Sequence, residues 1–98
     1  PYPVTNNHAE QTAKAADVAS MIAGEDRVDR NVAAKMGAED FSYMLLARPG
    51  AFIMIGNGDS AGLHHPDYDF NDEAIPFGCS YWVRLAETRL AGLAGLAG

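Results

Sequence analysis

The chain has 98 residues, which is enough for one small domain. Its 7 Lys and Arg stand against 13 Asp and Glu, giving a formal net charge of -6 and a pI near 4.7. Binding to nucleic acid or to an anionic membrane needs clustered basic residues, so we expect neither partner. No apolar run approaches the roughly 20 residues that a membrane-spanning helix needs. A single cysteine and no secretory leader lead us to expect a cytoplasmic protein without an internal disulfide.

The first quarter of the chain predicts a strand end followed by a helix. Residues 1–5 form a short extended piece that contains two prolines, typical of the end of a strand whose partners lie elsewhere. Asn7, with Glu10 three residues later, matches a capping box. The helix is predicted over residues 8–23 and ends before Gly24. Its apolar stripe consists of Ala15, Val18, Ala19 and Ile22.

The middle of the chain predicts a short helix and a buried strand. Residues 25–30 are a charged link with room for a very short edge strand. A helix is predicted over residues 39–47, where Glu39 and Asp40 suit the helix dipole. Residues 51–55 are an unbroken apolar run between glycines, typical of a strand buried on both faces. One strand cannot make a sheet alone, which indicates that the chain is a piece of something larger.

The last part of the chain predicts a loop, a helix and a tail. The glycine-rich loop 56–62 leads into a pair of histidines, and a helix is predicted over residues 76–90. Cys79 and Trp82 lie on its apolar stripe, so we expect both in the core and the thiol buried and inert. The tail, residues 90–98, repeats Leu-Ala-Gly. We expect it to be frayed or disordered, because each Gly weakens a helix by about 1 kcal/mol.

The histidine pair, His64 and His65, is the most suggestive chemical feature. It follows a predicted strand and loop, and open α/β sheets bind ligands outside the carboxyl ends of their strands. Imidazole is the commonest metal ligand and a near-neutral acid or base. Pro66 favours an extended His65, so the two rings should point to opposite sides and one metal ion should take only one of them. From the pair alone, two solvated loop histidines remain the stronger interpretation.

A second candidate is the acidic pair Glu39 and Asp40 at the start of the short helix. These carboxylates could bind a metal ion, orient a histidine or cap the helix, and spacing alone favours capping. The sequence contains no legible Ser-His-Asp or Cys-His arrangement. It contains no complete metal site either, because a catalytic zinc ion normally takes three protein ligands and a water.

Three blocks in order resemble a known family. They are Gly-Ala-Glu-Asp-Phe at residues 37–41, Pro-Gly-Ala-Phe-Ile-Met-Ile-Gly at 49–56, and a block from Leu63-His64-His65-Pro66 to Pro76. Together they resemble the C-terminal end of the metal-dependent amidohydrolases that include hippurate hydrolases, aminoacylases and auxin-conjugate hydrolases. The match is spread over about residues 3–87.

The resemblance implies an α/β fold, of which this chain is one piece. It would be the C-terminal segment of a mixed-sheet, zinc-peptidase-like catalytic domain. Residues 1–5 would end the last strand of an inserted lid and dimerisation domain, and residues 6–90 would return into the catalytic domain. Residues 91–98 would be a low-complexity tail. The intact enzyme is expected to be a homodimer.

The resemblance also implies a chemistry. The family hydrolyses N-acyl amino acids or small peptides with two divalent metal ions, which we expect to be zinc, manganese, cobalt or nickel. The glutamate that acts as general base, and most ligands, belong to earlier parts of the family's chain, so no catalytic residue is expected in this segment. His64 matches the last ligand histidine. His65 stands where the family usually has Asn or Ser, and it remains an alternative ligand.

Two further expectations follow from the same resemblance. Glu39 and Asp40 match a block that lines the active-site side and are expected to position substrate rather than bind metal. The isolated segment is expected to be inactive, because most of the ligands are absent from it. Two alternatives remain open: a stand-alone binding module that uses His64 and His65, and a structural remnant without activity.

Overall fold

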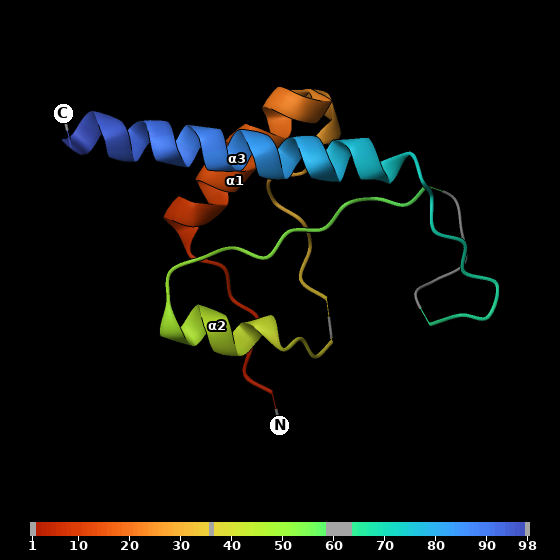
Figure 1. The fold of residues 1–98 in the computed structure, drawn as a ribbon. Coiled ribbons are helices and arrows are strands. Elements are labelled where there is room, and N and C mark those ends of the chain that lie inside the picture. The colour runs from red at the N-terminus through yellow and green to blue at the C-terminus, as the bar shows by residue number, and fades with distance from the viewer. Residues whose placement is uncertain (1, 36, 59–63, 98) are drawn as a thin grey trace. The chain divides into compact units, whose positions relative to one another are not determined.

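The computed structural model describes residues 2–35, 37–58 and 64–97. Its elements are α1 (Ala9–Ala23), the 3-10 helix η1 (Glu25–Arg27), α2 (Phe41–Ala47) and α3 (Ala74–Ala97) (Figure 1). The chain divides into two compact units, residues 1–53 and 54–98. Within the described ranges no residue lies in a strand, so the mixed sheet is not seen here. None of the described helices has the length and apolarity needed to cross a membrane.

Helix α1 confirms the first predicted helix, but not its cap. Ala15 and Val18 of the predicted stripe are buried, and Gly24 ends the helix with φ 92° and an N–H bond to the Ser20 carbonyl at 2.9 Å. This left-handed φ suits glycine, because it lacks a Cβ. The N-cap residue is His8, without a side-chain cap bond, so the predicted capping box is wrong.

Asn7 and His8 instead pair with the chain that follows α2. The Asn7 carboxamide donates to the Phe52 carbonyl at 2.9 Å and accepts from the Phe52 N–H at 2.7 Å. The His8 N–H donates to the Gly50 carbonyl at 3.0 Å, and the Gly50 N–H donates to Nδ1 of His8, also at 3.0 Å. A side-chain amide thus satisfies both backbone groups of Phe52, as a neighbouring strand would. This pairing explains why Asn7 does not cap α1.

The Asn7 pairing leads to a stability prediction. Asn7→Ala should lower the free energy of unfolding of the 98-residue chain by about 1–3 kcal/mol, because two part-buried hydrogen bonds are lost at about 0.5–1.5 kcal/mol each. Urea unfolding followed by far-ultraviolet circular dichroism measures the change. Asn6→Ala is the matched control, because Asn6 is exposed. Equal destabilisation by the two substitutions would contradict the assigned pairing.

The charged link after α1 is organised around Arg30 and contains no edge strand. The Arg30 guanidinium donates to the Glu25 carboxylate at 2.7 and 3.1 Å and to the Asp17 carboxylate at 2.9 Å. The bonds that Arg30 makes to Glu25 hold the pKa of Glu25 near 2, below its usual range. Glu25 is the first residue of helix η1, and its carboxylate pairs with Arg30. The possible edge strand over residues 25–30 is therefore wrong.

Helix α2 confirms the second predicted helix, and its apolar side faces the chain that returns beside Asn7. The Phe41 and Phe52 rings have centroids 5.8 Å apart, and Leu45 is buried. The run 51–55 is nevertheless not a strand, and Met54 is 70% exposed. The prediction of a strand buried on both faces is therefore not met. A strand needs a neighbouring strand for its N–H and C=O groups, and within the described residues none is present.

Helix α3 corrects three expectations about the C-terminal part. It begins at Ala74 and continues through the Leu-Ala-Gly repeat to Ala97, where we expected a frayed tail. Leu and Ala are strong helix formers, which offsets the cost of the glycines. Cys79 is exposed, and Trp82 is 65% exposed, so neither lies in a core. Within its own unit no second helix is described that could cover this face, and periodicity alone does not supply a cover.

Candidate functional site

The histidine pair lies in a hydrogen-bonded turn of the second unit. The Tyr68 N–H donates to the His65 carbonyl at 3.0 Å, and the Asp67 N–H donates to Nδ1 of the His65 ring, also at 3.0 Å. An oxygen of the Asp67 carboxylate lies 4.0 Å from the same nitrogen. The His65 side chain therefore serves its own turn.

This bond decides how a neutral His65 ring carries its proton. The Nδ1 lone pair accepts the Asp67 N–H, so the ring proton of the neutral form belongs on Nε2. A metal ion needs a free lone pair on one ring nitrogen, and this arrangement leaves neither available. If Nε2 of a neutral His65 ring in this position bound a metal ion, the ring proton would have to lie on Nδ1. That proton would then point at the Asp67 N–H, which is also a donor.

The preceding ring, His64, is placed differently. Its backbone has a φ of 71°, which is unusual for a residue with a side chain, and its side chain is exposed. None of the hydrogen bonds or ion pairs found among the described residues occupies its ring. The positive φ places His64 in the left-handed region, where histidine occurs more often than most residues with a side chain.

The Asn57 side chain, which precedes the histidines in the sequence, bonds to the backbone that follows them. Asn57 donates through Nδ2 to the Asp69 carbonyl at 2.8 Å, and its Oδ1 accepts the Asn71 N–H at 2.7 Å. We call these two bonds the Asn57 bridge. Gly58, which follows, has φ 77°, and a Cβ there would come within 3.3 Å of the Asn71 side chain. The positive φ favours glycine at this position, and a Cβ would also require a small shift of the Asn71 side chain.

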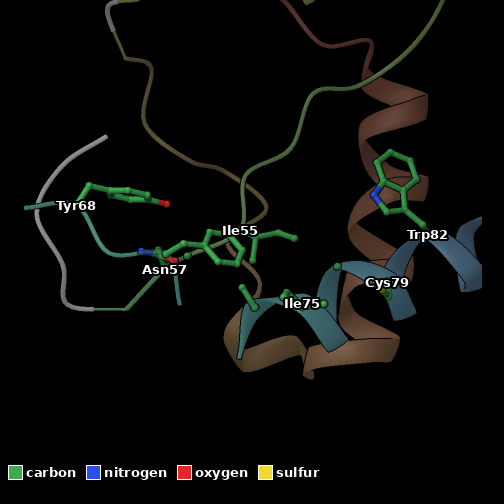
Figure 2. Close-up of a pocket in the computed structure, with 10 residues that line it drawn as sticks. Ile55, Asn57, Tyr68, Ile75, Cys79 and Trp82 are labelled. Carbon is green, nitrogen blue, oxygen red and sulfur yellow. The ribbon is translucent and has the colours of Figure 1, made fainter. Parts of the chain in front are cut away.

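The Asn57 bridge borders an open, mostly apolar pocket of about 370 Å³. Figure 2 shows Ile55, Asn57 and Tyr68 on the loop side of this pocket, and Ile75, Cys79 and Trp82 on helix α3. The predicted glycine loop is described only for residues 56–58, since residues 59–63 lie outside the described residues. The pocket offers apolar contacts, but it does not bring carboxylates or histidines together.

The acidic pair Glu39 and Asp40 begins helix α2, as predicted. The Glu39 carbonyl accepts the Ser42 N–H and the Asp40 carbonyl accepts the Tyr43 N–H, each at 3.1 Å. Asp40 is the N-cap residue, but its carboxylate makes no cap bond, so the helix does not use the side chain that spacing favoured for this role. Both acids lie in the first unit and both loop histidines in the second.

The described residues supply one candidate metal ligand rather than a metal site. Among them, no three His, Cys, Asp or Glu side chains are grouped so that they could hold a metal ion. His64 fits a single ligand, because its ring is exposed and not engaged by the described residues. A two-metal centre therefore does not fit this chain alone, and no reaction step can be derived within it.

Sequence reasoning found the histidines and acids, but it missed the two asparagines that pair with backbone. Asn7 and Asn57 each use one carboxamide to satisfy an N–H and a C=O elsewhere in their unit. The signal available for Asn57 is its position between two glycines, since Asn side chains often bond to nearby backbone in such loops. Its partners, 12 and 14 residues away, could not be read from spacing.

Comparison with known proteins identifies a family. Residues 1–88 match the peptidase family M20/M25/M40. The chain is 32% identical over 84 residues to a hippurate hydrolase from Campylobacter jejuni, which covers 86% of this chain and 22% of that protein. It is 30% identical over 90 residues to an IAA-amino acid hydrolase ILR1-like 2 from Arabidopsis thaliana, covering 88% of this chain and 20% of that protein.

A further similarity is shorter. An N-acetyldiaminopimelate deacetylase from Exiguobacterium sibiricum is 44% identical over 45 residues, which covers 45% of this chain and 12% of that protein. The chain thus spans about a fifth or less of the length of these curated relatives. No solved structure matches the chain significantly.

Proposed function

Because the chain belongs to peptidase family M20/M25/M40, we propose that it is the C-terminal segment of a metal-dependent amidohydrolase that acts on N-acyl amino acids or small peptides. The observation that carries the proposal is the family match over residues 1–88. The names of two relatives, a hippurate hydrolase and an IAA-amino acid hydrolase, support cleavage of an amide between an acyl group and an amino acid.

Within this proposal His64 supplies one metal ligand, and His65 does not. The support is the difference between the two rings. His65 already accepts the Asp67 N–H through Nδ1, whereas the described residues leave the His64 ring unengaged. The remaining ligands come from parts of the enzyme outside this sequence. Glu39 and Asp40 are proposed to position the substrate. In support, the Asp40 carboxylate is exposed and makes no cap bond to helix α2.

Two divalent metal ions, drawn from zinc, manganese, cobalt and nickel, would supply Lewis-acid polarisation of the amide carbonyl and activation of water. This chain's own part is to bind and to orient: His64 holds a metal ion, and the Asp67 turn keeps the adjacent ring directed to its own backbone. We also propose that the intact enzyme is a cytoplasmic homodimer. This part of the proposal rests on the resemblance alone.

The experiment that tests this function uses the full-length protein encoded by the reading frame that contains this segment. We expect it to release the free amino acid from hippurate or a related N-acyl amino acid, and a chelator should abolish turnover until a divalent metal ion is restored. Turnover that is indifferent to chelator, or the absence of any coding sequence upstream of Pro1, would contradict the proposal and favour the binding module or the remnant.

A further inference from the structure

We propose that one exposed face of helix α3 is a docking surface for the part of the enzyme that precedes Pro1. We call this face the α3 stripe, and it consists of Ile75, Cys79, Trp82 and Ala86. All four residues are exposed, and Ile75 and Trp82 expose 50% and 65% of their surface. The proposal rests on the proposed function, since only a longer enzyme supplies this partner.

Helix α3 presents three faces over residues 74–87, because residues three or four positions apart lie on the same side of a helix. The covered face is buried or half-buried and consists of Ala74, Gly78, Tyr81 and Leu85. The polar face is exposed and consists of Ser80, Arg84 and Glu87. The third face is the α3 stripe. A helix at the surface of a finished domain needs only a covered face and a polar face, so the exposed apolar face indicates a missing cover.

The α3 stripe continues into the pocket of the second unit. Ile75, Cys79 and Trp82 form the helix side of this pocket, and Ile55 and Tyr68 lie on its loop side (Figure 2). Ile55 is itself 51% exposed. The stripe and the pocket therefore make one open, mostly apolar groove. Contiguous apolar surface of this kind marks a place where another protein segment binds.

The occupant that the comparisons favour is the rest of the same enzyme. The chain covers 22% and 20% of two relatives, so most of each relative lies outside the matched segment. The family match over residues 1–88 contains the whole α3 stripe, which places the stripe within the family domain. The rival occupant is a second copy of this segment. Charge disfavours it, because two chains that each carry a net charge of -6 repel each other.

Alkylation of Cys79 reports whether the α3 stripe is covered. Cys79 is the single cysteine of the 98 residues, and it is exposed. The rate at which iodoacetamide modifies it is measured by peptide mass spectrometry in the 98-residue chain, in native full-length protein and in full-length protein unfolded by urea. We expect the native full-length protein to react at least about 10-fold more slowly than the other two samples, since a covered thiol reacts only when the structure opens locally.

Two matched substitutions test the face itself. Ala86→Glu places a carboxylate in the α3 stripe, and Ser80→Glu places the same group on the polar face; both positions are exposed here. In the full-length protein, Ala86→Glu should speed the alkylation of Cys79 at least about 10-fold, because covering an unpaired carboxylate is costly. Ser80→Glu should leave the parent rate unchanged. Should Ala86→Glu yield no folded full-length protein, the rates in the parent proteins decide the inference.

Equal alkylation rates in native full-length protein and in the 98-residue chain would overturn the inference, and so would equal effects of the two substitutions. Protection of Cys79 that grows with the concentration of the 98-residue chain would assign the stripe to a second copy instead. Turnover by the parent full-length protein judges the proposed function separately. Turnover with a freely reactive Cys79 refutes only the docking surface, and a protected Cys79 without turnover refutes only the proposed activity.

Discussion

His64→Ala in the full-length protein is expected to release one of the metal ions and to abolish nearly all turnover. The neighbouring His65 ring cannot replace the lost ligand, because its Nδ1 already accepts the Asp67 N–H at 3.0 Å. Metal content by elemental analysis and initial rates on an N-acyl amino acid measure the two effects. Added metal should not restore the variant.

His65→Asn is the matched control, and it is expected to keep metal and most turnover. An Asn side chain can accept the N–H of the residue two positions on, as the His65 ring does here, so the turn through Asp67 should survive. Loss of metal from His65→Asn with retention by His64→Ala would reverse the assignment of the ligand.

The second large effect is that the 98-residue chain by itself should not hydrolyse N-acyl amino acids. A catalytic metal normally takes three protein ligands, and the described residues contain no group of three that could hold one. Purified chain, assayed with added zinc, manganese or cobalt, should release no amino acid above background. The full-length protein, assayed in parallel, is the positive control.

A metal-dependent rate in the isolated chain, removed by a chelator and restored by metal, would contradict this expectation. Such a rate would mean that a complete site assembles from this segment alone, for example between copies. The variant His64→Ala of the same 98 residues would then show whether the site uses the proposed ligand.

Local features were predictable from the sequence because they depend on near neighbours. Helices α1 and α2 follow from apolar spacing, and the end of α1 follows from Gly24. The family was recognised from three short blocks, and the match over residues 1–88 confirms it. The histidine pair was found because its residue types are chemically distinctive, although its role stays a prediction.

The features that sequence reasoning missed depend on partners far along the chain. A periodic stripe shows which residues share a face of α3, but not whether anything covers that face, so Trp82 was placed in a core and is exposed. An apolar run shows that residues 51–55 suit burial, but a strand also needs a partner strand. The capping box at Asn7 failed because Phe52, 45 residues away, takes its carboxamide.

Asn57, which forms the bridge, is also a residue at which the protein can deamidate as it ages. Asn57 is followed by Gly58, and the backbone nitrogen of a glycine, unhindered by a side chain, can attack the preceding Asn side-chain carbonyl. Ammonia leaves as the cyclic imide forms, and water then opens the imide to aspartate or isoaspartate. Either product lacks the nitrogen that donates to the Asp69 carbonyl. Deamidation of this single residue would therefore remove half of the bridge in stored or long-lived protein, without any change to the histidines.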